Sequence, residues 1–179
     1  MTDEPPLIVW TVGHSSRPLE EFLLLLETER IESLADVRRY PGSRAHPHFN
    51  PEPLESALTS RHIEYVPFPE LGGRRAPDPQ SANTIWRNAA FRGYADYMDT
   101  PAFAQGLARL EALARGTRTA IMCSEAVWWR CHRSLISDAL KVSGATVLHI
   151  MGLGKVTEHP YTAAATVHDG RLSYGPAPV

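Results

Sequence analysis

The stretch TAIMCSEAVWWRCHRSLISDALKVS, residues 119–143, changes character twice along its length. Residues 119–122 are an apolar run typical of a buried strand, and residues 134–143 have the spacing of an amphipathic helix. The polar segment between them holds both cysteines of the chain and is predicted to form the turn from that strand into that helix. Such a turn presents backbone N–H groups and side chains together.

The same alternation of strands and helices extends through the rest of the chain. We predict strands over 7–12, 31–37, 63–66 and 145–151, and helices starting near Pro18, over 54–58 and from Thr100-Pro101 to Gly116. Residues 40–53, which are rich in proline, and residues 74–91 show little periodicity and are expected to be irregular. Asp169-Gly170 predicts a C-terminal hairpin over 166–174. Because strands separated by helices pair in parallel, the predicted fold class is α/β, a three-layer domain with a mainly parallel sheet flanked by helices.

Length and composition fit one globular domain over residues 1–179. Hydrophobic residues make up 43% of the 179 residues and charged residues 21%, and no apolar run approaches the roughly 20 residues of a membrane span. The first residues do not have the pattern of a signal peptide, so we expect a cytoplasmic protein with reduced cysteines and no membrane partner. The net charge of −2 argues against nucleic-acid binding through bulk charge, although residues 38–92 are richer in arginine than in acidic residues.

Polar residues cluster where the predicted strands end. In an open parallel sheet these carboxyl ends share one edge, and ligands bind beyond it. Residues far apart in the sequence therefore become candidates for one pocket. The candidates beyond the first three strands are His14, Ser15, Asp36, Arg38, Ser43, Arg44, Gly72 and Gly73, and those of the cysteine segment are Cys123, Glu125, Cys131, His132 and Arg133.

Several of these residues also have structural explanations. His14 lies between a strand and a helix N-terminus, which favours acid–base chemistry or packing, and Ser15 is equally suited to capping the helix. Asp36 and Arg38 are two residues apart, so they are placed to form an ion pair or to flank a ligand together. Tyr94 belongs to a helical stripe of aromatic residues that either faces the core or stacks on a base.

The spacing of the cysteines argues against two familiar kinds of site. A phosphatase-like loop needs an arginine at a fixed distance from its cysteine, and Arg130 is one place too late after Cys123. A zinc site of Cys123, Cys131 and His132 would separate the cysteines by seven residues, where structural zinc sites have about two to four. We therefore expect neither a metal nor a cofactor.

Thiol chemistry is the remaining use of the cysteines. At a helix N-terminus beside His132 and Arg133, Cys131 is expected to have a lowered pKa and to be more reactive than Cys123. The two thiols could also form a reversible disulfide, or pack as small apolar groups around a site whose chemistry uses other residues.

Arg133 is expected in the first turn of the helix, where a cation opposes the helix dipole. Its position therefore does not serve the stability of the helix and implies a counter-anion. Glu125, Asp36 and a phosphate or carboxylate of the substrate are the candidates.

The sequence resembles the family known as domain of unknown function 488. The resemblance rests on TVGHS, LADVRRYPGSR, EYVPFPELGG, FRGYADYM and above all MCSEAVWWRCHRS followed by VLHI, in this order between about Val9 and Ile150. It implies a small intracellular α/β protein of bacteria or archaea with a cysteine, histidine and arginine constellation suspected to be catalytic. Mapped onto this chain, the family pattern adds Tyr94 and His149 to the candidates and leaves residues 151–179 as a C-terminal extension.

Together these features predict an enzyme of the hydrolase or transferase class that acts on an anionic substrate bearing phosphate, a nucleotide or nucleic-acid component being favoured. The residues assigned to catalysis are His14, Glu125, Cys123, Cys131 and His132. The residues assigned to binding are Ser15, Asp36, Arg38, Ser43, Arg44, Gly72, Gly73, Tyr94, Arg133 and His149. Two alternatives stay open: a thiol redox or metal-binding protein, and a non-catalytic module that binds an anion or nucleic acid.

Overall fold

The protein is built around one sheet with helices on both faces. The structure is a computed structural model that describes residues 3–176. The strands of the main sheet are β1 (Ile8–Gly13), β2 (Ser33–Asp36), β3 (Glu64–Pro67), β4 (Thr119–Cys123), β5 (Thr146–Gly152) and β6 (Lys155–Glu158), and a separate antiparallel hairpin joins β7 (Thr166–His168) to β8 (Arg171–Ser173). The helices are α1 (Leu19–Thr28), α2 (Pro51–Thr59), α3 (Ala89–Tyr97), α4 (Pro101–Gly116) and α5 (Arg133–Val142), with short 3₁₀ turns at Pro47–Phe49, Pro69–Leu71 and Trp128–Arg130.

The strand order of the main sheet is β3-β2-β4-β1-β5-β6. The first five strands are parallel, and only β6, at the edge, runs antiparallel to its neighbour β5. Strand β1 lies between β4 and β5, and all but the first of its residues are buried. A strand covered on both faces needs apolar residues on both, which explains why β1 is an almost unbroken apolar run.

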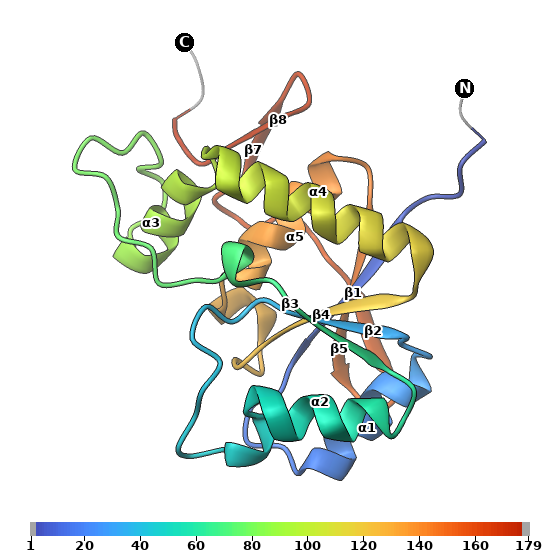
Figure 1. Cartoon of the computed structure of the whole chain (residues 1–179). Helices are drawn as coiled ribbons and strands as arrows, with labels where there is room; N and C mark the ends of the chain where they lie inside the picture. Colours follow the sequence, from blue (N-terminus) through green and yellow to red (C-terminus); the bar gives the residue numbers. More distant parts are fainter. Residues whose placement is uncertain (1–2, 177–179) are drawn as a thin grey trace.

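The helices form two layers around this sheet. Helices α1 and α2 cover one face and α3, α4 and α5 the other (Figure 1). Each layer has its own core, the first containing Phe22, Leu26 and Leu54, and the second Tyr94 and Leu135. The predicted three-layer α/β fold with a mainly parallel sheet and a C-terminal hairpin is confirmed.

Three elements differ from the sequence prediction, and one is helix α3, which begins at Ala89 within the segment 74–91 that was expected to be irregular. Helix α2 begins at Pro51, within the segment expected to be irregular, because prolines are tolerated in a first helical turn whose N–H groups have no partner inside the helix. Strand β6 was not predicted at all, and it adds the start of the C-terminal extension to the main sheet. The last residues of that extension, 177–179, lie outside the described part of the chain. No helix among residues 3–176 is long and apolar enough to cross a membrane.

Candidate functional site

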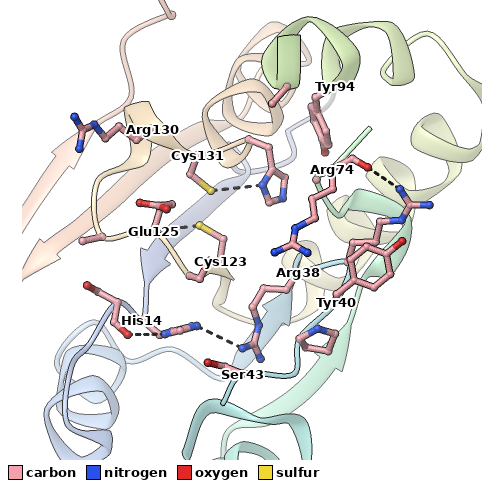
Figure 2. A pocket seen from close by; sticks show the side chains of 18 of the residues that line it. His14, Arg38, Tyr40, Ser43, Arg74, Tyr94, Cys123, Glu125, Arg130 and Cys131 are labelled. Atoms are coloured by element: carbon pink, nitrogen blue, oxygen red, sulfur yellow. Dashed lines mark hydrogen bonds between the residues drawn. The ribbon is translucent and has the colours of Figure 1, made fainter. Parts of the chain in front are cut away.

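The functional candidates gather around one cavity of about 640 Å³. It opens beyond the carboxyl ends of β2, β4 and β1, which are neighbours in the sheet (Figure 2). Ten of the predicted site residues line it: His14, Ser15, Arg38, Ser43, Gly73, Tyr94, Cys123, Glu125, Cys131 and His132. The expected convergence of the strand ends therefore occurs in the structure.

The cysteine segment is held against the end of β1 by backbone hydrogen bonds. The N–H of His14 donates to the carbonyl of Cys123 at 3.0 Å, and that of Ser15 donates to Ser124 at 2.9 Å. A Cβ at Gly13 would lie 1.7 Å from the carbonyl oxygen of Glu125, so only glycine permits this approach. The serine side chains do not cap α1, which starts after Pro18 without a side-chain cap.

Both cysteines are buried free thiols beside the cavity. Burial alone would raise the pKa of Cys123, but a hydrogen bond with Cys131 and the positive charge of Arg133 lower it below its ordinary value. Burial and the neighbouring Cys123 raise the pKa of Cys131 well above the ordinary range. These directions are opposite to the expectation from the sequence, in which Cys131 is the more acidic thiol.

Arg133 lies behind the cavity wall and does not line the cavity. Its side chain is buried, Nη2 donates to the carbonyl of Ala126 at 3.1 Å, and Nε and Nη1 have no partner within residues 3–176. Neither Glu125 nor Asp36 pairs with it, since Asp36 is bound to Arg38 and the Glu125 side chain makes no ion pair in this part of the chain. Neither of the two protein carboxylates considered is the counter-anion of Arg133. The positive charge of Arg133 instead lowers the pKa of Cys123.

Two of the three histidines that line the cavity, His14 and His132, are held in defined tautomers. His132 donates from Nε2 to the carbonyl of Val37 at 2.9 Å, which leaves its Nδ1 as an acceptor 3.5 Å from the Cys131 sulfur. His14 donates from Nδ1 to the carbonyl of Ser15 at 2.8 Å, and its Nε2 accepts from Nη1 of Arg38 at 3.4 Å. Burial lowers the pKa of each imidazole to about 4, so both are neutral at pH 7.

Asp36 and Arg38 form the buried ion pair that their spacing permits. Nη2 of Arg38 lies 2.8 Å from Oδ2 of Asp36, and Tyr65 donates its hydroxyl to the same oxygen at 2.6 Å. Asp36 is thus a buried support beneath the cavity and does not line it. Arg38 lines the cavity, where its remaining Nη1 faces His14.

The cavity carries more positive charge than the sequence analysis assigned to it. Arg39, Arg74 and Arg130 line it in addition to Arg38, and Glu125 is the only carboxylate among the described residues of its wall. Tyr40 and His46 also line it. Each of the three additional arginines is adjacent in sequence to a predicted site residue, and this adjacency is the signal that would have identified them.

Four predicted residues have other surroundings. Arg44 is exposed and is not part of the cavity wall. Gly72 is buried against the backbone of Arg39, where a Cβ would come within 2.6 Å of backbone atoms. Tyr94 reaches the wall but is 1% exposed, and its hydroxyl donates to the carbonyl of Leu71 at 2.7 Å. His149 belongs to a separate buried network on the far side of the cysteine segment.

That network extends from β1 to the C-terminal extension. The Thr11 hydroxyl donates to Nδ1 of His149 at 2.5 Å, Nε2 of His149 donates to Nδ1 of His159 at 2.8 Å, and Nε2 of His159 donates to Asp138 at 2.8 Å. Burial, together with His159 and Arg133, lowers the pKa of His149 to about 2. The register pairs His149 with Thr11, two residues before the end of β1, which keeps His149 away from the cavity. Within the described residues no three histidine, cysteine or acidic side chains gather as potential metal ligands.

A comparison with protein families finds a match to the part of the chain that contains the cysteine segment. Residues 18–140 match the family described as "Domain of unknown function DUF488". The chain belongs to the DUF488 family. The match contains both cysteines and Arg133, whereas His14, Ser15 and His149 of this DUF488 protein lie outside the matched range. Neither the curated proteins nor the solved structures gave a match.

Proposed function

We propose that this DUF488 protein is an enzyme of the hydrolase or transferase class that acts on a substrate bearing phosphate, with Cys123 as its nucleophile. The proposal is carried by one observation: Cys123 lies in the wall of a cavity lined by Arg38, Arg39, Arg74 and Arg130 and by a single described carboxylate. Arginine forms forked hydrogen bonds with phosphate, so such a lining favours a phosphorylated ligand over a neutral one.

The surroundings of Cys123 favour a thiolate. A buried cation is costly unless an anion is close, and Arg133 has no carboxylate partner among residues 3–176. A Cys123 thiolate supplies that anion, and the neighbouring Cys131 lowers the pKa of Cys123 further. Thiolates, not thiols, are the reactive nucleophiles, so this pairing serves catalysis.

The reaction follows from these positions. The Cys123 sulfur attacks phosphorus, the S–P bond forms, and the P–O bond to the leaving group breaks, with the leaving oxygen taking a proton from solvent. In the second step a water attacks the phosphorus and gives a proton to Nε2 of His14, which passes it to solvent, while the S–P bond breaks and phosphate and the Cys123 thiolate are released. His14 is neutral at pH 7 and its Nε2 carries no proton, and Nη1 of Arg38, which donates to Nε2 at 3.4 Å, turns to the bound phosphate when Nε2 acts as the base.

The test compares two serine substitutions. Purified wild type, Cys123→Ser and Cys131→Ser are assayed against phosphomonoesters and nucleotides, and thiolate reactivity is measured as the rate of alkylation by iodoacetamide from pH 5 to 9. We expect Cys123→Ser to lose turnover by about 10³-fold or more, and Cys131→Ser to retain part of it. Alkylation that proceeds at neutral pH in Cys131→Ser but not in Cys123→Ser identifies Cys123 as the thiolate. Equal turnover in wild type and Cys123→Ser rejects the proposal, and phosphate binding without turnover in wild type supports a non-catalytic binding module.

Two buried free thiols that line the same cavity favour thiol redox chemistry as a second candidate. A peroxide would oxidise Cys123 to a sulfenic acid, and the Cys131 thiol would displace water from it to form a disulfide. The peroxide takes up both electrons and becomes water or an alcohol. Counting free thiols before and after equimolar peroxide tests this candidate, and a count that stays at two rejects it.

A further inference from the structure

Tyr40 presents an exposed aromatic ring at the wall of the cavity. It follows Arg38 and Arg39 in the loop after β2, and 59% of its surface is exposed although it lines the cavity. The guanidinium carbons of Arg39 and Arg74 lie 5.3 and 5.7 Å from the centre of its ring. No other ring of the described chain contacts it, and its exposure leaves part of the ring open to a ligand beside the two guanidinium groups.

The Arg39 side chain is tied to the backbone of Arg74, whereas the Arg74 side chain is exposed. Nη1 of Arg39 donates to the backbone carbonyl of Arg74 at 2.8 Å, which ties the loop after β2 to the segment after β3. Tyr40, Arg39 and Arg74 therefore form one surface, which we term the Tyr40 platform. Figure 2 shows Tyr40 and Arg74 on the side of the cavity away from Glu125 and Arg130. The platform combines an aromatic face with positive charge, the two features that bind a base and its phosphate.

The other two aromatic side chains of the cavity, Phe91 and Tyr94, are packed against rings of the protein, and Phe91 is stacked on Trp86 at 4.9 Å. Tyr94 is 1% exposed, and its ring is covered by Tyr97, Phe103 and His132 at 5.1 to 6.1 Å. Tyr94 is a candidate for base stacking from its sequence, and its burial removes it from that role. A cavity of about 640 Å³ is also far larger than a phosphate group requires and is of the size that holds a whole small ligand.

We propose that the substrate is a nucleotide unit whose phosphate lies near Cys123 and whose base stacks on the Tyr40 platform. The inference rests on the phosphate site of the proposed function and adds the substrate class to it. A free mononucleotide and the end of a single-stranded nucleic acid share this chemistry. Stacking on one aromatic ring tolerates any base, so the platform selects for a nucleotide and not for a particular sequence.

Calorimetric titration of the Cys123→Ser protein tests the inference without turnover. The probes are adenosine monophosphate, ribose 5-phosphate, inorganic phosphate and a single-stranded DNA ten-mer with a terminal phosphate. Tyr40→Ala and Tyr40→Phe are made in the same background, and Tyr161→Ala is the matched control. Tyr161 is also exposed, at 37%, and has Lys141 5.0 Å from its ring, but it does not line the cavity.

We expect adenosine monophosphate to bind about tenfold more tightly than ribose 5-phosphate, and Tyr40→Ala to abolish that difference. Tyr40→Phe and Tyr161→Ala should keep it, and inorganic phosphate should bind equally to all variants. The inference is overturned if adenosine monophosphate and ribose 5-phosphate bind the Cys123→Ser protein with equal affinity. It is also overturned if Tyr40→Ala keeps the preference for adenosine monophosphate. Either result leaves the phosphate site intact. Failure of every probe to bind overturns the proposed function as well. Tighter binding of the ten-mer than of the mononucleotide assigns the site to nucleic-acid ends, and the reverse assigns it to free nucleotides.

Discussion

Two clusters of histidine and charged residues lie on opposite sides of the cysteine segment, and they differ in how their hydrogen bonds are used. In the buried network, Thr11, His149, His159 and Asp138 bind one another, and Asp138 also accepts from Thr162 and Tyr174. Every polar side-chain atom of the network has a partner within residues 3–176. In and behind the cavity wall, by contrast, Arg133 has two unpaired nitrogens and Arg74 donates no side-chain hydrogen bond to the described chain.

This difference separates stability from function. A network whose donors and acceptors are all satisfied fixes the structure and leaves nothing for a ligand to bind. The cavity keeps donors and charge available, which raises its energy unless a ligand is present. Trp128 connects the two clusters. Its ring stacks on His149 at 4.6 Å and contacts His159 at 4.9 Å, and its backbone belongs to the segment that carries the two cysteines. Changes on the network side should therefore act mainly on stability, and changes on the cavity side mainly on binding.

The largest effect on stability is expected from Asp138→Ala. The substitution leaves His159, Thr162 and Tyr174 without their buried acceptor. Breaking one partner of a buried charged network costs about 3–5 kcal/mol. Urea unfolding of Asp138→Ala and of the control Asp99→Ala, an exposed carboxylate, measures it. A cost below about 1 kcal/mol for Asp138→Ala would mean that the network does not hold the C-terminal extension.

Trp128 and Trp129 offer a matched pair in which the first side chain contacts the network and the second does not. Trp129 is 53% exposed, whereas Trp128 is partly buried against the two histidines. Trp128→Ala should lower the free energy of unfolding by about 2 kcal/mol, which is less than the loss expected for a fully buried tryptophan. Trp129→Ala should lower it by about 0.5 kcal/mol or less. Chemical denaturation gives both values. If Trp128 anchors the cysteine segment, the alkylation rate of Cys123 changes in Trp128→Ala only, and equal rates in the two variants contradict this anchoring.

The fold was predictable because its signals are local. Apolar runs and helical spacing identified five strands of the main sheet, and the cap at α4 was correctly predicted from Thr100, whose hydroxyl accepts from the N–H of Phe103. Strand β6 is short, with three exposed residues and one partly buried, so its pattern carries no burial signal. Helix α3 begins at Ala89, and its first two residues are exposed alanines, so its start carries no burial signal.

The site was predictable to the level of strand ends and no further. Parallel pairing brings His14, Arg38 and Cys123 to one edge whatever the register, so their convergence followed from topology. The location of His149 depends on its register with Thr11, which no residue pattern specifies. The relative pKa of the two cysteines depends on which thiol donates a hydrogen bond and on the direction of the Arg133 side chain, and both are tertiary properties.

Acid should distinguish the two clusters through their histidines. Burial lowers the pKa of His14 to about 4 and that of His149 to about 2, whereas in the unfolded chain both titrate near their ordinary value of 6.5. The unfolded state therefore binds more protons as the pH falls below 6.5, and each histidine reduces stability by up to about 1.4 kcal/mol per pH unit. For His14 this loss ends near pH 4, and for His149 it continues to lower pH.

Unfolding of wild type, His14→Asn and His149→Asn at pH 7, 6, 5, 4 and 3.5 measures this. The stability advantage of wild type over His14→Asn should shrink from pH 6.5 to 4 and then stay constant. Its advantage over His149→Asn should still be shrinking between pH 4 and 3.5. A pH-independent difference in either comparison would show that the histidine concerned is not held neutral in the folded protein.

The smallest effect is expected at Arg44, and it sharpens the boundary of the cavity. Arg44 and Arg74 are both exposed arginines on loops that follow sheet strands, and neither forms an ion pair among residues 3–176. Arg74 lines the cavity and Arg44 does not. Both alanine variants should change the free energy of unfolding by about 0.5 kcal/mol or less, because exposed side chains without specific contacts contribute little. Titration with adenosine monophosphate should separate them, with several-fold weaker binding in Arg74→Ala and unchanged binding in Arg44→Ala. Arg44 is outside the cavity wall and should not contact a ligand bound in the cavity. Weaker binding in Arg44→Ala would therefore show that the anion site extends along the loop after β2.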